Sequence, residues 1–69
     1  MMPAAAAALL LSWLEARGAL VFLIDGDYVR VNLDPITDFG EMTPEILAHA
    51  VLTLRDEMRQ ILIARRVRH

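Results

Sequence analysis

Cysteine and lysine are absent from this 69-residue chain, and aromatic residues make up only 6% of it. Without cysteine the chain can form neither a disulfide nor a thiolate metal site, which fits the reducing cytosol where we expect the protein to work. A chain of this length forms one domain, and such a domain usually needs a staple or a partner. Because 57% of the residues are hydrophobic, we expect a dense core or apolar surface shared with a partner.

Hydrophobic runs of membrane-spanning length are also absent. The run at residues 4–11 is followed by Ser12, Glu15 and Arg17, and a spanning helix needs about 20 apolar residues. A signal peptide has a basic segment before its apolar run and a cleavage site after it, and this run has neither a basic segment nor an obvious cleavage site. We therefore interpret this run as an Ala/Leu-rich helix and expect no membrane partner.

The combinations of residues that carry catalysis or bind ions are missing. Ser12 lies in a predicted helix, and neither His49 nor His69 has an evident partner, so we expect no enzyme. Residues 25–27 read Asp-Gly-Asp, a fragment of a calcium loop whose other ligands are absent. Turn formation explains them, and the sequence has no phosphate loop. We expect no metal and no cofactor.

Charge is unevenly distributed along the chain, whose net charge is −2. Residues 1–50 carry two arginines and seven acidic residues, whereas residues 51–69 carry five arginines and two acidic residues. Basic side chains near the end of a helix are favoured by the helix dipole alone, so we interpret them as a solvated face. Nucleic-acid-binding domains are usually strongly basic, and we do not expect nucleic acid as the partner.

The first helix is predicted at residues 3–17. Pro3 suits a first helical turn, and alanine and leucine are strong helix formers. Gly18 follows in the position of a glycine that ends a helix. The predicted core stripe consists of Ala7, Leu10, Leu11 and Leu14.

Two further helices are predicted after a loop at residues 34–42. Thr43-Pro44-Glu45 has the N-cap, first-turn proline and acidic residue of a helix start. Thr53 precedes Asp56 by three residues, which resembles a second capping arrangement. We predict helices at 44–51 and 54–66 with a bend between them, and a single unbroken helix is the alternative.

A β-hairpin is predicted at residues 19–33. Asp25-Gly26 is a favoured dipeptide for a two-residue type I′ turn, and such a turn would pair Leu23 with Tyr28. The predicted core face then carries Leu20, Phe22, Val29 and Val31. The predicted opposite face carries Val21, Leu23, Tyr28, Arg30 and Asn32.

The predicted fold is therefore a small α+β domain, residues 1–69, with the order α-β-β-α-α. A two-stranded sheet is marginal alone and has two open edges, and helices can cover one of its faces. The free edges and the other face could accept an added strand from another protein. Because Tyr and Arg beside aliphatic side chains are typical of interface centres, we predict a partner-binding site. Its residues are Val21, Leu23, Tyr28, Arg30 and Asn32.

Several of these segments together resemble a known family. The likeness rests on five segments. They are the Leu-rich first helix ending in Gly18, the turn at residues 25–27, the strand at 28–31 (Tyr-Val-Arg-Val), the Met-Thr-Pro-Glu-Ile segment at 42–46, and residues 54–65. They are similar to the TubC-type N-terminal docking domains of nonribosomal peptide and hybrid polyketide synthetases. The resemblance covers about residues 9–66.

The resemblance implies an α-β-β-α-α fold, often dimeric, that orders the subunits of an assembly line. In that family a C-terminal segment of the upstream subunit docks beside the second strand, and basic side chains meet acidic ones. Here that strand is residues 28–33, with Arg30 at the basic position and Asn32 at a polar one. Tyr28 departs from the family, which often has another basic residue there. Such domains normally continue into a catalytic domain, whereas this sequence stops at His69, so we expect an excised piece or a free-standing relative.

Two other functions are compatible with the sequence. One is a free-standing regulator or mobile-element adaptor whose Arg-rich last helix binds nucleic acid or another regulator. The other is a structural homodimer packed through Leu9 and Trp13, two apolar residues on a helix face next to the predicted core stripe.

Overall fold

The computed structural model describes residues 3–67, and His69 lies outside them. The chain forms a helix, an antiparallel hairpin and two more helices, so the predicted α+β class and element order are confirmed. The five elements are α1 (Pro3–Ala16), β1 (Leu20–Ile24), β2 (Tyr28–Asn32), α2 (Pro44–Thr53) and α3 (Arg55–Val67).

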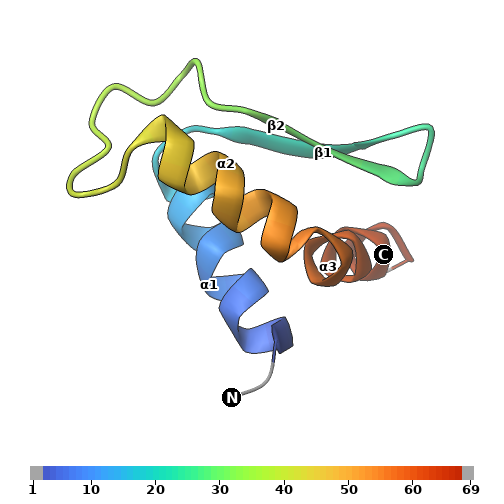
Figure 1. Ribbon diagram of the computed structural model, residues 1–69. Coiled ribbons are helices and arrows are strands. Elements are labelled where there is room, and N and C mark those ends of the chain that lie inside the picture. The colour runs from blue at the N-terminus through green and yellow to red at the C-terminus, as the bar shows by residue number, and fades with distance from the viewer. Residues whose placement is uncertain (1–2, 68–69) are drawn as a thin grey trace.

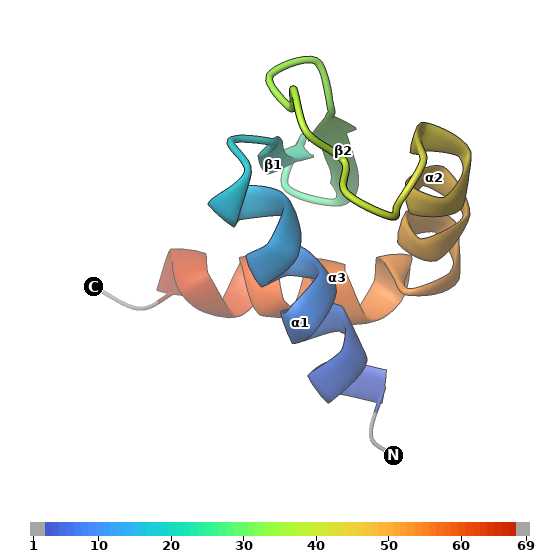
Figure 2. The same cartoon turned by 90° about the vertical axis from the view of Figure 1, so that its left-hand side faces the viewer.

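The hairpin forms one layer and the helices form the other. In Figure 1 the two strands lie across the top of the molecule, with all three helices below them. Figure 2 shows α1 crossing α3 and α2 standing beside β2. One face of the sheet is therefore covered by helices, and the opposite face is left open.

The junction between α1 and β1 fixes which side of β1 faces the core. Gly18 adopts φ 90°, and its N–H donates to the Glu15 carbonyl at 3.1 Å while the Ala19 N–H donates to the Leu14 carbonyl at 3.0 Å. This pair of bonds is the Schellman motif, which turns the residue after the glycine back onto the helix. Ala19 is accordingly buried. Side chains alternate along a strand, so Val21 and Leu23 point inward as well.

The predicted register of the hairpin is wrong by one residue. Asp25 and Gly26 both have positive φ, as a type I′ turn requires, but Ile24 pairs with Tyr28 and Leu23 with Val29. Asp27 is therefore an extra residue in the turn. The shift leaves β2 facing as predicted and inverts β1.

The inner and outer faces of the sheet follow from this register. Partly buried Val21, Leu23, Val29 and Val31 pack against the core. Exposed Leu20 and Phe22, which were predicted in the core, lie on the outer face. The burial of Ala19 explains the correction, because it requires the odd-numbered residues of β1 to face the helices.

The bend between the last two helices is confirmed, although its predicted capping is wrong. Thr43 caps α2, since its hydroxyl accepts the Ile46 N–H at 3.1 Å. At the other end the Leu54 N–H donates to the Ala50 carbonyl and ends α2. The Thr53 hydroxyl donates back to the His49 carbonyl at 2.9 Å instead of capping α3.

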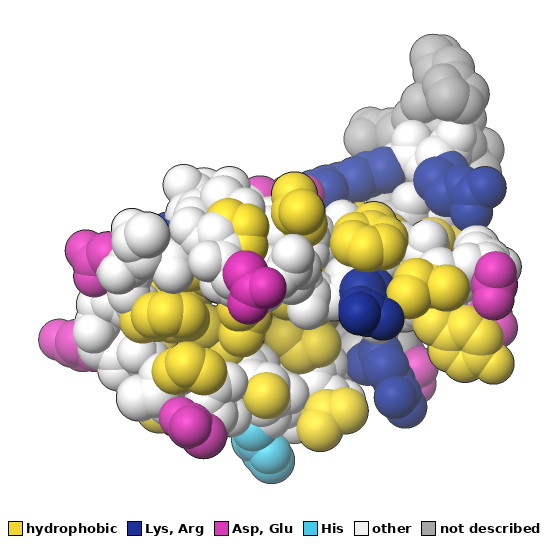
Figure 3. Space-filling view, turned by 90° about the horizontal axis from the view of Figure 1, so that it is seen from above, with side chains coloured by type: hydrophobic (Ala, Val, Ile, Leu, Met, Phe, Trp, Pro, Cys, Tyr) yellow, Lys and Arg dark blue, Asp and Glu magenta, His cyan; other side chains and the backbone are white. Residues whose placement is uncertain are grey.

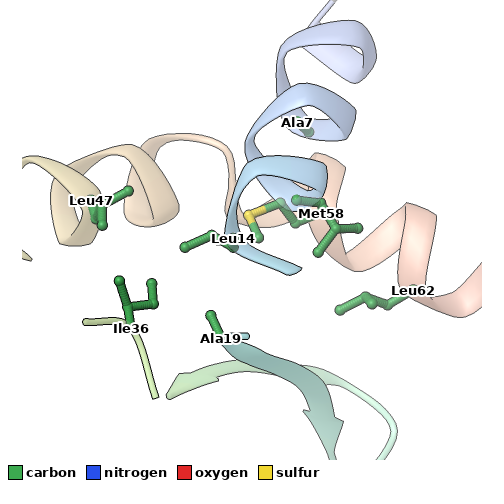
Figure 4. Close-up of a cluster of buried hydrophobic side chains, with 8 residues drawn as sticks. Ala7, Leu14, Ala19, Ile36, Leu47, Met58 and Leu62 are labelled. Carbon is green, nitrogen blue, oxygen red and sulfur yellow. The ribbon is translucent and has the colours of Figure 1, made fainter. Parts of the chain in front are cut away.

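The core lies where the helices meet the sheet and the loop. Figure 4 shows side chains from α1, α2 and α3 converging on Ile36 of the loop and on Ala19. Within α2, Ile46 is 49% exposed, whereas its neighbour Leu47 is buried. The buried residues are Ala7, Leu11, Leu14, Ala19, Ile36, Leu47, Met58 and Leu62.

Candidate partner-binding surface

The sheet has two open edges, because its two strands pair only with each other within residues 3–67. The Ile24 carbonyl accepts the Asp27 N–H at 3.1 Å, so the main chain of Ile24 points across the hairpin. In an antiparallel pair, alternate residues point their main-chain groups toward the partner strand and away from it. The outward-pointing residues are Val21 and Leu23 on β1, and Val29 and Val31 on β2.

The outer face of the sheet is mostly apolar, with Arg30 and Asn32 as its polar side chains. Three large side chains are substantially exposed there: Leu20 at 53%, Phe22 at 45% and Tyr28 at 66%. Arg30 lies on the same face and is also exposed. Figure 3 looks onto this side of the molecule and shows hydrophobic side chains gathered next to basic ones. Aromatic and aliphatic side chains around an arginine are common at the centre of protein interfaces.

Two hollows lie along the edge of β2. The hollow between β2 and α2 is about 220 Å³ and almost entirely apolar, and it is lined by Val31, Leu33, Ala48, Val51 and Leu52. The hollow near the turn is about 290 Å³ and carries charge, and it is lined by Asp27, Tyr28, Val29, Arg55, Asp56 and Arg59. This edge therefore has an apolar end and a charged end, with the outward main-chain groups of Val29 and Val31 between them.

The five residues predicted to bind a partner do not share one face. Tyr28, Arg30 and Asn32 lie together on the outer face, as predicted. Val21 and Leu23 lie on the inner face of β1, at the opposite edge of the sheet. The predicted grouping of these five residues on one face is wrong, because the extra residue in the turn inverts β1 relative to β2.

Sequence reasoning missed Leu20 and Phe22 as outer-face residues. The signal that could have found them lies before the strand. Gly18 was recognised as the glycine that ends α1, and the residue after such a glycine normally contacts the helix. Applied to Ala19, this rule places Leu20 and Phe22 on the outer face by simple alternation.

The arginines of α3 contact the rest of the molecule. Arg59 Nη1 donates to Asp27 Oδ1 at 3.0 Å, which joins α3 to the hairpin turn. Arg65 donates two hydrogen bonds to the Glu15 carboxylate of α1, at 2.9 and 3.1 Å. The side-chain hydrogen bond to Glu15 raises the pKa of Arg65 above its usual value. Two of the basic side chains of α3 are therefore paired with carboxylates of the hairpin turn and of α1.

The two residues predicted at a homodimer interface differ in their surroundings. Leu9 is 73% exposed. Trp13 is half-buried against the core, and the Arg17 guanidinium lies 4.0 Å from the centre of its ring. The guanidinium already covers one face of the indole ring by a cation–π contact, so that face is not available to a partner. Leu9 is therefore the more accessible of the two residues.

Residues 3–67 contain no group of three or more His, Asp or Glu side chains placed to hold a metal ion. Polar side chains are not among the buried residues of this part of the chain, and His49 is exposed. In the same range, every helix is too short or too polar to cross a membrane.

Comparison of the chain with protein-family models, with curated proteins and with solved structures gives no match.

Proposed function

We propose that this protein is a docking module that binds a short extended segment of a partner polypeptide as a third strand along β2. The proposal rests on one observation, which is that the open edge of β2 combines unpaired main-chain groups with an adjacent apolar hollow. Val29 and Val31 direct their main-chain groups outward, beside the apolar hollow between β2 and α2. Strand addition needs these two features, because main-chain hydrogen bonds supply affinity and pockets for alternate side chains supply specificity.

The chemistry of the edge also describes the segment that it would bind. Side chains of an added strand alternate between the two faces of the sheet. Those on the inner face would enter the hollow lined by Val31, Leu33 and Leu52 and should be apolar. Those on the outer face would lie beside exposed Arg30 and Tyr28 and should include an acidic residue. The expected partner segment therefore alternates apolar and acidic side chains.

The resemblance to docking domains of peptide and polyketide synthetases suggests where this segment comes from. On that basis the partner is the C-terminal segment of an upstream synthetase subunit in the cytosol, and the protein orders subunits without a catalytic step or cofactor of its own. Ordering a flexible tail consumes part of the binding free energy, so we expect a Kd of order 1–100 μM.

An NMR titration tests the proposal. Labelled protein is titrated with peptides copied from the C-termini of synthetase subunits encoded nearby, and with the same peptides in scrambled order. Chemical-shift changes confined to β2, α2 and the start of α3 with one native peptide are expected. If none of the peptides shifts these signals, the docking function on this edge is wrong.

Binding of nucleic acid or of a regulator through α3 is the alternative function. It has less support, because Arg59 and Arg65 are already paired with Asp27 and Glu15. Contacts to phosphate would make the affinity fall steeply with salt concentration. A fluorescence titration with duplex DNA at two salt concentrations would therefore detect this function directly.

A further inference from the structure

We propose that the open edge of β1 is a second strand acceptor, which takes an extended segment bearing acidic side chains. This site lies on the opposite side of the hairpin from the docking edge of β2. It does not depend on the function proposed above, because it uses different main-chain groups and the C-terminal half of α3, whereas the β2 edge lies beside α2 and the start of α3.

A hollow beside β1 provides the space for such a segment. It has a volume of about 490 Å³ and lies between β1 and the C-terminal half of α3. Val21 and Leu23 direct their main-chain groups outward along this edge, and both residues line the hollow together with Leu62 of α3. An added strand would therefore find hydrogen-bonding groups beside an apolar floor.

The wall of the hollow is basic. Arg65 and Arg66 of α3 both line it. Arg65 is paired with Glu15 and still keeps 46% of its side-chain surface exposed. Arg66 is exposed, and no acidic side chain of residues 3–67 lies within ion-pair distance of it. An acidic side chain of a bound segment would supply the missing opposite charge.

The position of Arg66 places its charge at one end of the hollow. A Cβ atom at Gly26 would lie only 3.1 Å from Arg66 Nη1, so this guanidinium sits against the hairpin turn. The segment that fits should therefore carry its acidic residue near the turn and apolar residues beside Val21 and Leu23. This pattern is specific enough to test with short synthetic peptides.

A second copy of the chain fits this edge less well. Pairing β1 with its own copy about a twofold axis would join the outward groups of Val21 to those of Leu23 in the other copy. The Gly26 end of each strand would then lie opposite the Gly18 end of the other, which is preceded by Arg17. Arg66 occupies the Gly26 end, so this pairing would bring Arg17 toward it and no carboxylate of the other strand. The charge of the edge favours an acidic segment over self-association.

The experiment uses a capped seven-residue peptide with valine at positions 3 and 5, aspartate at both ends and threonine between them, so that valine and aspartate share one face in either strand direction; lysine replaces aspartate in the control. Each is titrated into the labelled protein at low salt, and amide shifts are followed by NMR. The expected result is a saturable shift of β1 and of residues 62–66 with the aspartate peptide and none with the lysine peptide. Shifts confined to β2 and α2, or no shifts at all, would overturn the proposal.

Two variants identify the groups responsible. Arg66→Glu should weaken binding at β1 by about fivefold or more, as expected for loss and reversal of one charge contact. Arg55→Glu makes the same charge change on the same helix outside this hollow and should leave β1 binding intact. Val21→Pro removes an outward N–H, which an edge strand tolerates, and should abolish binding at β1 while leaving β2 unchanged.

Equal effects of Arg66→Glu and Arg55→Glu would contradict the assignment, because the binding would then reflect overall charge. Concentration-dependent shifts of β1 without any peptide, together with a doubled mass in light scattering, would show that a second copy occupies the edge and would also overturn the proposal. If Val21→Pro fails to fold, the comparison of the two arginine variants still decides the outcome.

Discussion

Arg59 Nη1 lies 3.0 Å from Asp27 Oδ1, so the middle of α3 holds the extra residue of the hairpin turn. Asp27 is the residue that makes the turn one longer than its Asp-Gly sequence indicates. The ion pair therefore involves the residue that sets the turn length, and the turn length sets which face of β1 lies opposite each face of β2.

The contribution of this ion pair to stability should be small and sensitive to salt. Its side chains are 33% and 62% exposed, and exposed pairs contribute about 0.2–1 kcal/mol. A double-mutant cycle of Asp27→Asn with Arg59→Ala in urea unfolding should give a coupling in this range that falls at high salt. The matched cycle with Asp25→Asn, in the same turn, should give none. Equal coupling in both cycles would mean that Arg59 responds only to the general charge of the turn.

Two leucines in one strand test the register. Leu23 packs against the core, whereas Leu20 is 53% exposed. Leu23→Ser should lower the free energy of unfolding by about 1–2 kcal/mol, in proportion to the apolar area that it buries. Leu20→Ser should cost clearly less, and urea unfolding of both variants measures the difference. The reverse order would support the register of a two-residue turn.

The glycine that ends α1 should be intolerant of a side chain. Gly18 has φ 90°, and a Cβ there would meet Pro35 at an ordinary 3.8 Å, so the cost comes from backbone strain. Gly18→Ala should destabilise the protein by about 1–2 kcal/mol. Gly18→Asn should cost less, because asparagine tolerates positive φ better. Thermal unfolding of the two variants measures the difference, and an alanine variant as stable as the parent would show that the turn can relax.

Reversing the charge on the outer face should weaken docking without unfolding the protein. Arg30→Glu should raise the Kd for an acidic partner peptide by about fivefold to tenfold, which corresponds to about 1 kcal/mol. Arg17→Glu makes the same charge change at the end of α1 and should have little effect on the Kd. Calorimetric titration of both variants gives the comparison. An unchanged Kd for Arg30→Glu would remove this residue from the site.

The positions of the helices could be predicted from the sequence because the residues that start and end a helix act locally. Gly18 ends α1, and Thr43 and Pro44 start α2, each through hydrogen bonds or φ preferences within a few residues. A bend between α2 and α3 could also be predicted, although it lies at Leu54 and not at residues 52–53, and the capping bond that was expected to produce it is not formed.

The register of the hairpin could not be predicted from the turn alone. Asp25-Gly26 has the positive φ values that its sequence favours, yet the number of residues in the turn depends on contacts outside the hairpin. Before β1, Ala19 is buried in the core. After the turn, Asp27 forms an ion pair with Arg59 of α3. The predicted binding site depended on the predicted register. Tyr28, Arg30 and Asn32 were therefore grouped correctly, whereas Val21 and Leu23 were placed on the wrong face.

Hydrogen exchange at two valines of β2 tests the central claim most directly. The N–H groups of Val29 and Val31 point outward at the edge of β2 in the free protein, so they should exchange quickly. Addition of a partner strand should slow both amides at least tenfold, while the exchange of Arg30, which already pairs with Phe22, should change much less. If a peptide binds tightly and Val29 and Val31 remain as exposed to exchange as before, the partner does not add to β2 as a strand.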